Sequence, residues 1–483
     1  MDKMNRRSFL KGSLATAGGI ALFNISGTRA GGKIIGANDR IRIAVAGLRG
    51  RGGSHMGAFA GMNNVEVAYV VDPDATLLPR AIANIKKRGK NTPKGFQDIR
   101  KALEDKDLTA VSIATPNHWH SLMTIWACQA GKHVYVEKPC SHDVFEGRSA
   151  VAASRKYNVI VQHGTQQRSS GGRANQMAAI HAGVYGKLLV SHGYCCKPRG
   201  SIGTKKTEKP PSTLDWNLWK GPAEAGEFHR NFVHYNWHWF WATGNGDIGN
   251  QGVHEMDVAR WALSNQTLPV RVMSLGGRFG WNDQAETPNS QFAVMEFPNG
   301  QYLLFTVRNL NHKGYKRQVK NDYYFDAGKL VNGKFIPKGD KKPEKVEVPQ
   351  AKITGGGTFG SFIATVRAGK REMTNGDILD AHYSSALGHL ANISLRLGKK
   401  APFNEKAGRF GDNKAVYDGF MELHSILKDD AKLPVDKTQY MVGPWLTFDP
   451  KSEKFTGDRA KEANAMLHEK NRKGFEVPAP DKV

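Results

Sequence analysis

The chain has 483 residues, of which 40% are hydrophobic and 23% are charged, and its formal net charge is +25. This length allows about two or three domains with a large buried core, and the composition is that of a globular protein. The positive charge is compatible with nucleic acid, with an acidic glycan or with solubility alone. Because the sequence has no zinc-finger spacing, helix-turn-helix pattern or RNP-like segment, we expect no nucleic-acid partner.

Cysteine content is low for a chain of this size. The four cysteines are Cys128, Cys140, Cys195 and Cys196, and they show neither a CxxC motif nor a metal-ligand spacing. We therefore expect buried thiols and no metal site. A chain with a large core needs no disulfide, even outside the cytoplasm.

The N-terminus has the form of an export sequence. Residues 5–23 read NRRSFLKGSLATAGGIALF, in which Arg6 and Arg7 precede a short apolar run. This run is shorter than the roughly 20 residues that a transmembrane helix needs, so we expect no stable membrane insertion. We predict a twin-arginine signal peptide over residues 1–30 and a linker over 31–39, with the twin-arginine translocase exporting the folded protein to the periplasm.

Short apolar strands alternate with helical stretches between residues 40 and 160. Four β-type segments, RIRIAVAG, VEVAYVVD, LTAVSIATP and KHVYVEKP, end at Gly47, Asp72, Pro116 and Pro139. The helix-compatible stretches are Gly53–Met62, Ala75–Arg88, His120–Ala130 and Val144–Tyr157. This alternation is typical of βαβ units, so we predict an α/β fold that begins with a Rossmann domain, a doubly wound parallel sheet over residues 40–160.

After residue 160 the strands become longer and are joined by Pro-Asn-Gly turn chemistry. The segments LLVSHGYCC, VRVMSLGGRFG, SQFAVMEFPNGQYLLFTVRN and QVKNDYYFDAG predict a large, mainly antiparallel open sheet. Helices are expected over Asp377–Leu397 and Lys414–Lys428. We therefore predict a C-terminal α+β domain over residues 161–430, followed by a C-terminal extension over 431–483.

A glycine cluster separates the first strand from its helix. In AVAGLRGRGGSHMGAFA, Gly47, Gly50 and Gly52 permit a tight turn and let phosphate groups approach the backbone N–H groups of a helix N-terminus. Arg49 stands at the usual second glycine of the dinucleotide fingerprint. Asp72 ends the second strand, where a carboxylate accepts from ribose hydroxyls and disfavours a 2′-phosphate. We expect NAD as the cofactor, and NADP remains open because Arg49 could bind that phosphate.

Several further segments, in a fixed order, resemble one protein family. IATPNHWH, AGKHVYVEKP and DWNLWKGP, together with the Gly47–His55 loop, resemble the glucose–fructose oxidoreductase / inositol dehydrogenase / MocA family of sugar dehydrogenases. HLANISLRLGKK and GPWLTFDP extend the resemblance toward the C-terminus. The resemblance implies a substrate-binding second domain whose open sheet makes a homo-oligomer, a dimer or tetramer. It also implies a cofactor site that includes Thr115, Pro116, Asn117, His120, Glu137 and Lys138.

The resemblance also implies which groups react. In this family the lysine of Glu-Lys-Pro and a histidine of the second domain meet over the nicotinamide, and here these are Lys138 and His254. We expect them to form an acid/base pair that takes the hydroxyl proton as hydride leaves, with the proton's holder undecided. We expect Glu137 to shape the site and pair with a neighbour. Asn250 replaces the family's usual aspartate, cannot ionise, and could orient the substrate or His254.

Aromatic and polar side chains gather just before this histidine. In HYNWHWFWATGNGD, we expect Tyr235, Trp237 and His238 to contact the substrate, because aromatic faces stack on pyranose rings and polar groups meet hydroxyls. QHGTQQR, which follows another strand, offers Gln167 and Arg168 as further contacts. The predicted substrate is a small carbohydrate or glycoside.

Three functions are compatible with these residues. The favoured one is an exported NAD-dependent sugar or glycoside dehydrogenase that oxidises a ring hydroxyl, such as that at C3, to a ketone. The alternative is a redox-neutral NAD-dependent glycoside hydrolase, like the α-N-acetylgalactosaminidases, which share the GLRG loop. The intact Glu-Lys-Pro lysine favours the dehydrogenase. A non-catalytic sugar-binding protein is disfavoured because Lys138 and His254 are both present.

Export bears on how the cofactor is used. Free NAD is scarce outside the cytoplasm, so an exported nicotinamide enzyme should fold around its cofactor before translocation. We therefore expect the cofactor to stay bound between turnovers. Its reduced form would then be reoxidised in place, either by a second sugar or keto compound or by the same substrate.

Overall fold

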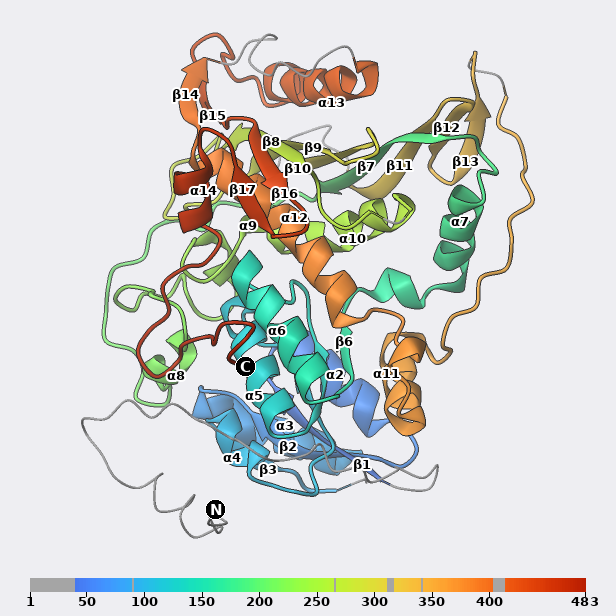
Figure 1. Ribbon diagram of the computed structural model, residues 1–483. Coiled ribbons are helices and arrows are strands. Elements are labelled where there is room, and N and C mark those ends of the chain that lie inside the picture. Colours follow the sequence, from blue (N-terminus) through green and yellow to red (C-terminus); the bar gives the residue numbers. More distant parts are fainter. Residues whose placement is uncertain (1–39, 89–90, 265, 311–316, 340–341, 403–412) are drawn as a thin grey trace.

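A computed structural model describes residues 40–88, 91–264, 266–310, 317–339, 342–402 and 413–483. The predicted signal peptide and linker lie outside these residues. The described chain forms one sheet of six strands and one of eleven. Figure 1 shows the smaller sheet and its helices, in blue and cyan, below the larger sheet.

The first sheet is entirely parallel, with the strand order β3-β2-β1-β4-β5-β6. Its strands bury apolar side chains on both faces, which is why they read as continuous hydrophobic runs. The strands are β1 Ile41–Ala46, β2 Val65–Val71, β3 Lys94–Phe96, β4 Ala110–Ile113, β5 His133–Val136 and β6 Val161–His163. The helices are α2 Gly50–Ala60, α3 Leu78–Lys87, α4 Ile99–Leu103, α5 His120–Gln129 and α6 Val144–Lys156. The predicted doubly wound Rossmann sheet is confirmed.

Two details of this domain differ from the sequence prediction. The edge strand β3 was not predicted, because its Lys-Gly-Phe sequence carries little β propensity. The sheet also extends to His163, beyond the predicted boundary at residue 160, since β6 pairs with β5.

The second sheet is mostly antiparallel, as predicted, and β7 and β10 form its parallel pair among the described strands. Its strand order is β13-β12-β11-β7-β10-β9-β8-β15-β14, and β16 and β17 are attached through β8. The bounds are β7 Leu188–Cys196, β8 Arg271–Gly277, β9 Ser290–Glu296, β10 Tyr302–Arg308, β11 Gln318–Phe325, β12 Gly328–Val331, β13 Lys334–Pro337, β14 Lys399–Pro402, β15 Gln439–Val442, β16 Leu446–Asp449 and β17 Lys454–Thr456.

Helices cover this sheet unequally. Helices α10 and α12 pack on the face toward the first domain, and α13 packs on the opposite face (Figure 1). The helices are α7 Gly171–His181, α8 Trp216–Lys220, α9 Gly246–Gly249, α10 Gly252–Ala262, α11 Gly357–Ala368, α12 Ile378–Arg396, α13 Lys414–Ser425 and α14 Ala460–Ala465.

Two late segments return to the Rossmann domain. Helix α11 packs Phe362 and Val366 into the core beside β1. The C-terminal residues Phe475, Val477 and Val483 join the core around α5 and α6, and the C-terminus lies beside these helices in Figure 1. The two domains are thus tied together at several points.

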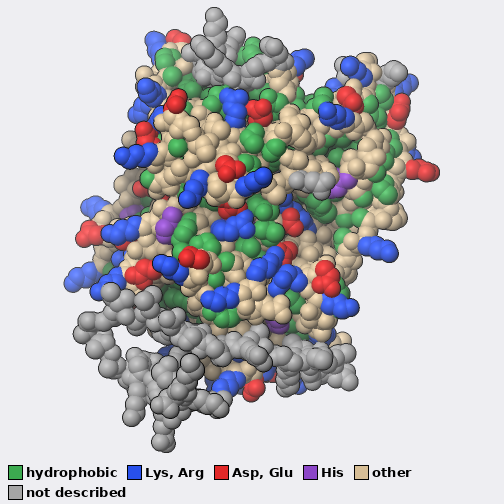
Figure 2. All heavy atoms as spheres, in the orientation of Figure 1, with side chains coloured by type: hydrophobic (Ala, Val, Ile, Leu, Met, Phe, Trp, Pro, Cys, Tyr) green, Lys and Arg blue, Asp and Glu red, His purple; other side chains and the backbone are tan. Residues whose placement is uncertain are grey.

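The described surface shows no sign of a single basic face in the view drawn. Figure 2 shows lysine and arginine side chains interspersed with aspartate and glutamate. All four cysteines are buried and free, as predicted. Across the described part of the chain, no helix has both the length and the apolar character needed to cross a bilayer.

Candidate active site

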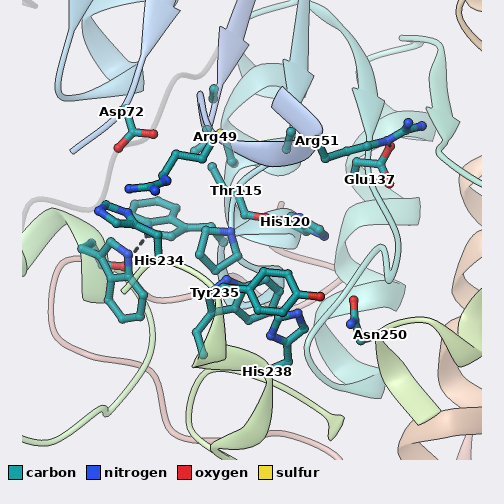
Figure 3. A pocket seen from close by; sticks show the side chains of 18 of the residues that line it. Arg49, Arg51, Asp72, Thr115, His120, Glu137, His234, Tyr235, His238 and Asn250 are labelled. Atoms are coloured by element: carbon teal, nitrogen blue, oxygen red, sulfur yellow. Dashed lines mark hydrogen bonds and ion pairs between the residues drawn. The ribbon is translucent and has the colours of Figure 1, made fainter. Parts of the chain in front are cut away.

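A cavity of about 430 Å³ lies at the carboxyl ends of the first-sheet strands. Open α/β sheets bind ligands at this edge. Asp72, Arg49 and Thr115 lie on one side of it, and His234 and Tyr235 face them from the second domain (Figure 3).

The glycine loop forms a cradle at one end of the cavity. Gly47 has a φ of +82°, and a Cβ there would lie 2.5 Å from the carbonyl oxygen of Ala114. A Cβ on Gly52 would lie 1.7 Å from the oxygen of Gly47, so both positions require glycine. At Gly50 and Gly53 no atom lies within 4 Å of the Cβ position, which leaves open space beside the start of α2.

Two further observations fit this cradle to a dinucleotide. Helix α2 has Arg49 as its N-cap, with no side-chain hydrogen bond to its first N–H groups, so these donors can bind a phosphate. Thr115 lines the cavity, and its Oγ1 is buried without a partner among the described residues. The residues present therefore fit a bound dinucleotide.

Asp72 occupies the position expected for ribose recognition. Its Oδ2 accepts from the N–H of Leu48 at 2.9 Å, and its Oδ1 accepts from the N–H of Asp74 at 3.0 Å. Burial raises the pKa of Asp72 to about 6. Arg49 lies near it in Figure 3, and Asp74 pairs with His234 at 3.2 Å.

Lys138 follows β5 and reaches across to the second domain. Its Nζ donates to the backbone oxygen of Asn250 at 3.0 Å and to the Oδ1 of Asn250 at 2.8 Å. An ammonium has three N–H donors, so one remains for a ligand. Burial lowers the pKa of Lys138, against the opposing effect of the Glu137 carboxylate. Asn250 thus holds Lys138, a role that the sequence did not predict.

His254 lies in α10 and lines the same cavity. Burial, and then the charge of Lys138, lower the pKa of His254 to about 3. The imidazole is therefore neutral near pH 7 and has a lone pair that can accept a proton. The cavity thus brings together the two residues predicted to react.

Glu137 pairs with two neighbours of the first domain, as its sequence context suggested. Its Oε1 accepts from Arg51 Nε at 2.6 Å and lies 3.0 Å from His55 Nε2. Burial alone would raise the pKa of Glu137, but the hydrogen bond from His55 and the charge of Arg51 hold it well below its ordinary value. His55 is fixed in turn by Ser112, at 2.7 Å. Glu137 is therefore an ionised anchor beside Lys138.

The second-domain wall carries a charged pair that sequence reasoning missed. Arg199 forms two bonds with Asp247, at 3.0 and 2.9 Å, and donates to the Oη of Tyr235 at 2.9 Å. Asp247 also lies 3.4 Å from the amide nitrogen of Asn250. The GNGDIGN segment places this aspartate one turn before Asn250, which was the available sequence clue.

The predicted site residues differ in where they lie. Neither Gln167 nor Arg168 lines the cavity, whereas the neighbouring Gln166 does. Asn117 is buried behind the wall and donates to Asn245 Oδ1 at 2.5 Å. The predicted residues that do line the cavity are Gly47, Arg49, Asp72, Thr115, Pro116, His120, Glu137, Lys138, Tyr235, Trp237, His238, Asn250 and His254.

Arg168 is instead committed to buried carboxylates. Its Nε bonds to both oxygens of Asp257, at 2.9 and 2.8 Å, and its Nη1 lies 3.5 Å from Asp380. Its side chain is 7% exposed and that of Asp257 is 1% exposed, so Arg168 has little reach toward a substrate.

We expect Arg168→Met to destabilise the fold. The buried Asp257 loses its cation and keeps only the hydrogen bond from Ser384 among its side-chain contacts with the described residues, which costs about 3–5 kcal/mol of unfolding free energy. Urea unfolding measures this cost. The exposed pair Arg230–Glu208, at 2.6 Å, provides the control, since Arg230→Met should cost less than about 1 kcal/mol. A normally stable Arg168→Met with a raised KM would instead restore Arg168 as a substrate contact.

A segment of the second domain bonds to the Rossmann domain at one side of the cavity. Thr213 accepts from the N–H of Ala75 at 2.9 Å, and Asp215 donates its N–H to Pro73 at 3.0 Å. The C-terminal Arg472 holds the same segment through Gly221 at 3.0 Å. Leu218 and Trp219 of this segment line the cavity. The segment that contains Leu218 and Trp219 therefore forms part of the cavity wall, and the C-terminal segment supports it from behind.

This combination defines a class of protein: a two-domain oxidoreductase with a dinucleotide cradle and a lysine and histidine at the interdomain cavity. Comparison with known families agrees. A profile described as an oxidoreductase family with an NAD-binding Rossmann fold matches residues 41–165, and the profile of its C-terminal alpha/beta domain matches 193–421. The chain belongs to the glucose–fructose oxidoreductase / inositol dehydrogenase / MocA family, as its motifs predicted, and NAD is the cofactor of its first domain. A twin-arginine signal profile matches residues 3–23, which indicates export by that pathway.

Curated relatives from Shewanella species carry the name glycosyl hydrolase family 109 protein. The protein of Shewanella putrefaciens (strain CN-32) is 29% identical over 215 residues, which cover 40% of this chain and 46% of the relative. That of Shewanella baltica (strain OS195) is 30% identical with the same coverage. The match thus spans less than half the length of these relatives.

Solved structures share the fold at low identity. The WlbA dehydrogenase from Bordetella pertussis, in complex with NADH and UDP-GlcNAcA, is 18% identical, with a TM-score of 0.53. The match covers 72% of this chain and 94% of that one. A levoglucosan dehydrogenase, in complex with NADH and levoglucosan, is 17% identical with a TM-score of 0.53, covering 72% and 95%. At these identities the likeness shows the fold alone.

Proposed function

We propose that this protein is an exported sugar or glycoside dehydrogenase that oxidises a ring hydroxyl with a tightly bound NAD. The observation that carries the proposal is the meeting of Lys138 and the neutral His254 in the cavity beside the glycine cradle. Bound NAD would supply a hydride acceptor. The remaining chemistry is the removal of the hydroxyl proton, for which the chain needs a base and a hydrogen-bond donor.

The two residues divide this task. Neutral His254 accepts the hydroxyl proton at a ring nitrogen. Lys138, held by Asn250, donates its third N–H to the same substrate oxygen and stabilises the negative charge that develops there. Asn250 positions Lys138 without adding a charge, whereas an aspartate at this position would add a negative one.

Contacts between the two domains at one side of the cleft support the retention of the cofactor. The segment around Thr213 bonds to the Rossmann domain beside Asp72, and Arg472 holds this segment from outside. A nucleotide that enters during folding would be covered on this side. This arrangement agrees with export in the folded state and with periplasmic residence. Residence in the periplasm and a homo-oligomer are part of the proposal.

The first test uses the protein exported by the twin-arginine pathway and purified without added nucleotide. Acid extraction should release NAD. A panel of glucosides and galactosides is then added while reduced-nicotinamide absorbance is followed. A change in absorbance with no release of free sugar supports the dehydrogenase. A protein that holds no nucleotide and binds none on addition would overturn the proposal.

A redox-neutral glycoside hydrolase is the second candidate, because the Shewanella relatives are named glycosyl hydrolase family 109 proteins. In that case the same experiment gives free sugar without net nicotinamide reduction. The two candidates share the cavity, so product analysis separates them.

We expect Asp72→Ala to change nucleotide preference from NAD toward NADP. The substitution removes an acceptor for ribose hydroxyls and a charge that repels a 2′-phosphate, and it leaves Arg49 free to bind that phosphate. Competition between the two nucleotides during refolding should change the NAD/NADP ratio about 100-fold, given a few kcal/mol per charged contact. Asp98→Ala, also in the cavity wall, is the matched control. Unchanged selectivity in Asp72→Ala would show that Asp72 does not read the ribose.

A further inference from the structure

Lys197 follows β7 directly and lines the cavity on the side formed by the second domain. The neighbouring strand holds its backbone at two points. Its N–H donates to the carbonyl oxygen of Arg308 at 3.0 Å, and its own carbonyl accepts from Asn309 Nδ2 at 2.8 Å. The lysine therefore stands on a rigid sheet edge, and its side chain is partly buried.

Its ammonium differs from the other cations at this end of the cavity. Arg199 is paired with Asp247, and Lys138 is bonded to Asn250. Among the described residues, Lys197 Nζ forms no hydrogen bond or ion pair.

The surroundings of this ammonium are positively charged. Burial lowers the pKa of Lys197, and the charges of Arg199 and Arg317 act in the same direction, with Asp247 opposing them. The opposing carboxylate, Asp247, is already paired with Arg199. An unpaired cation at a partly buried site gains more from an anionic ligand than an exposed one does, because solvent screens it less.

Lys197 also lies close to the reacting groups. Lys197, Lys138 and His254 line the same cavity, and the nearby Arg199 is paired with Asp247. Asp247 contacts Asn250, which holds Lys138. A substrate placed on Lys138 and His254 would therefore have a second part facing Lys197.

We propose that the substrate is an acidic saccharide and that Lys197 binds its carboxylate or sulfate group while Lys138 and His254 act on a ring hydroxyl. This inference rests on the proposed function and narrows its substrate class. The formal net charge of +25 would favour the encounter with such a substrate.

Binding, measured by calorimetry on the NAD-loaded protein, tests the assignment independently of turnover. The probes are methyl glucosides, galactosides and mannosides, each compared with its uronate and its 6-sulfate. We expect at least one acid to bind about 10–100-fold more tightly than its neutral counterpart, the range for a charged hydrogen bond. The uronate and sulfate arms distinguish the two sources of the anionic group.

Variants of Lys197 complete the test. Lys197→Gln should abolish the preference by weakening the binding of the acid far more than that of its neutral counterpart, and Lys197→Arg should retain much of the preference. Lys187→Gln, on the exposed residue just before the same strand, is the matched control. No preference for an acid in any pair, or equal loss for acids and neutral sugars in Lys197→Gln, overturns the inference. Acids that bind through Lys197 without any nicotinamide reduction would overturn the dehydrogenase and leave only the anion-binding role of Lys197 standing.

Discussion

Lys138→Met should lower kcat about a thousand-fold while the protein still folds and still holds its nucleotide. Methionine fills the space of the lysine stem but cannot donate to the substrate oxygen as charge develops there. General acid–base groups contribute about 10²–10⁴-fold, and a charged donor in a cavity belongs in the upper part of this range. Single-turnover reduction of the bound nicotinamide, read by absorbance, measures the effect.

The chain offers a closely matched control for this variant. Lys132 precedes the same strand, β5, is also buried, and donates to the backbone carbonyls of Asp105 and Lys106 at 2.8 and 3.1 Å. It does not line the cavity. Lys132→Met should therefore lower the free energy of unfolding and leave kcat within about two-fold of that of the unsubstituted protein, because Lys132 lies outside the cavity. Equal kcat losses in both variants would remove Lys138 from the reaction.

The pH profile of kcat/KM should stay level well below pH 6.5. His254 accepts a proton only in its neutral form, and its pKa in the folded protein is about 3. Neutral His254 is therefore present across pH 5–8. Activity that depends on it should decrease only in strongly acidic solution, where the imidazole becomes protonated. On the alkaline side, the lowered pKa of Lys138 places the loss of its proton below the ordinary value for lysine.

The variant His254→Gln identifies the source of this profile. It should lower kcat about 10²–10³-fold, because it removes the group proposed to accept the hydroxyl proton. His192→Asn is the control: His192 is also buried with a pKa of about 3, but it bonds to Thr306 at 2.9 Å and lies outside the cavity. Its activity should be normal. An acid limb near pH 6–7 in the unsubstituted protein would contradict the assignment of His254 as the base.

The fold class and most of the cavity residues near the glycine loop could be predicted from local sequence patterns. The alternation of short apolar strands with helices defines βαβ units, and this pattern depends only on local periodicity. At Gly47 and Gly52 the close approach of the backbone requires glycine, so the glycine pattern in the sequence predicts the cradle. The Glu-Lys-Pro segment likewise marks the end of β5, where such sheets bind ligands.

The hydrogen bonds and ion pairs around Lys138 and Lys197 could be seen only in the folded structure. Lys138 and Asn250 are far apart in the sequence, yet they form the two hydrogen bonds that fix the lysine. The sequence predicts Arg168 as a substrate contact, but in the structure its side chain pairs with Asp257. Lys197 became notable only because Asp247 pairs with Arg199 instead. Each of these contacts joins residues that are distant in the sequence. Which charged groups pair is set by the packing of the folded chain, not by the residues beside them in the sequence.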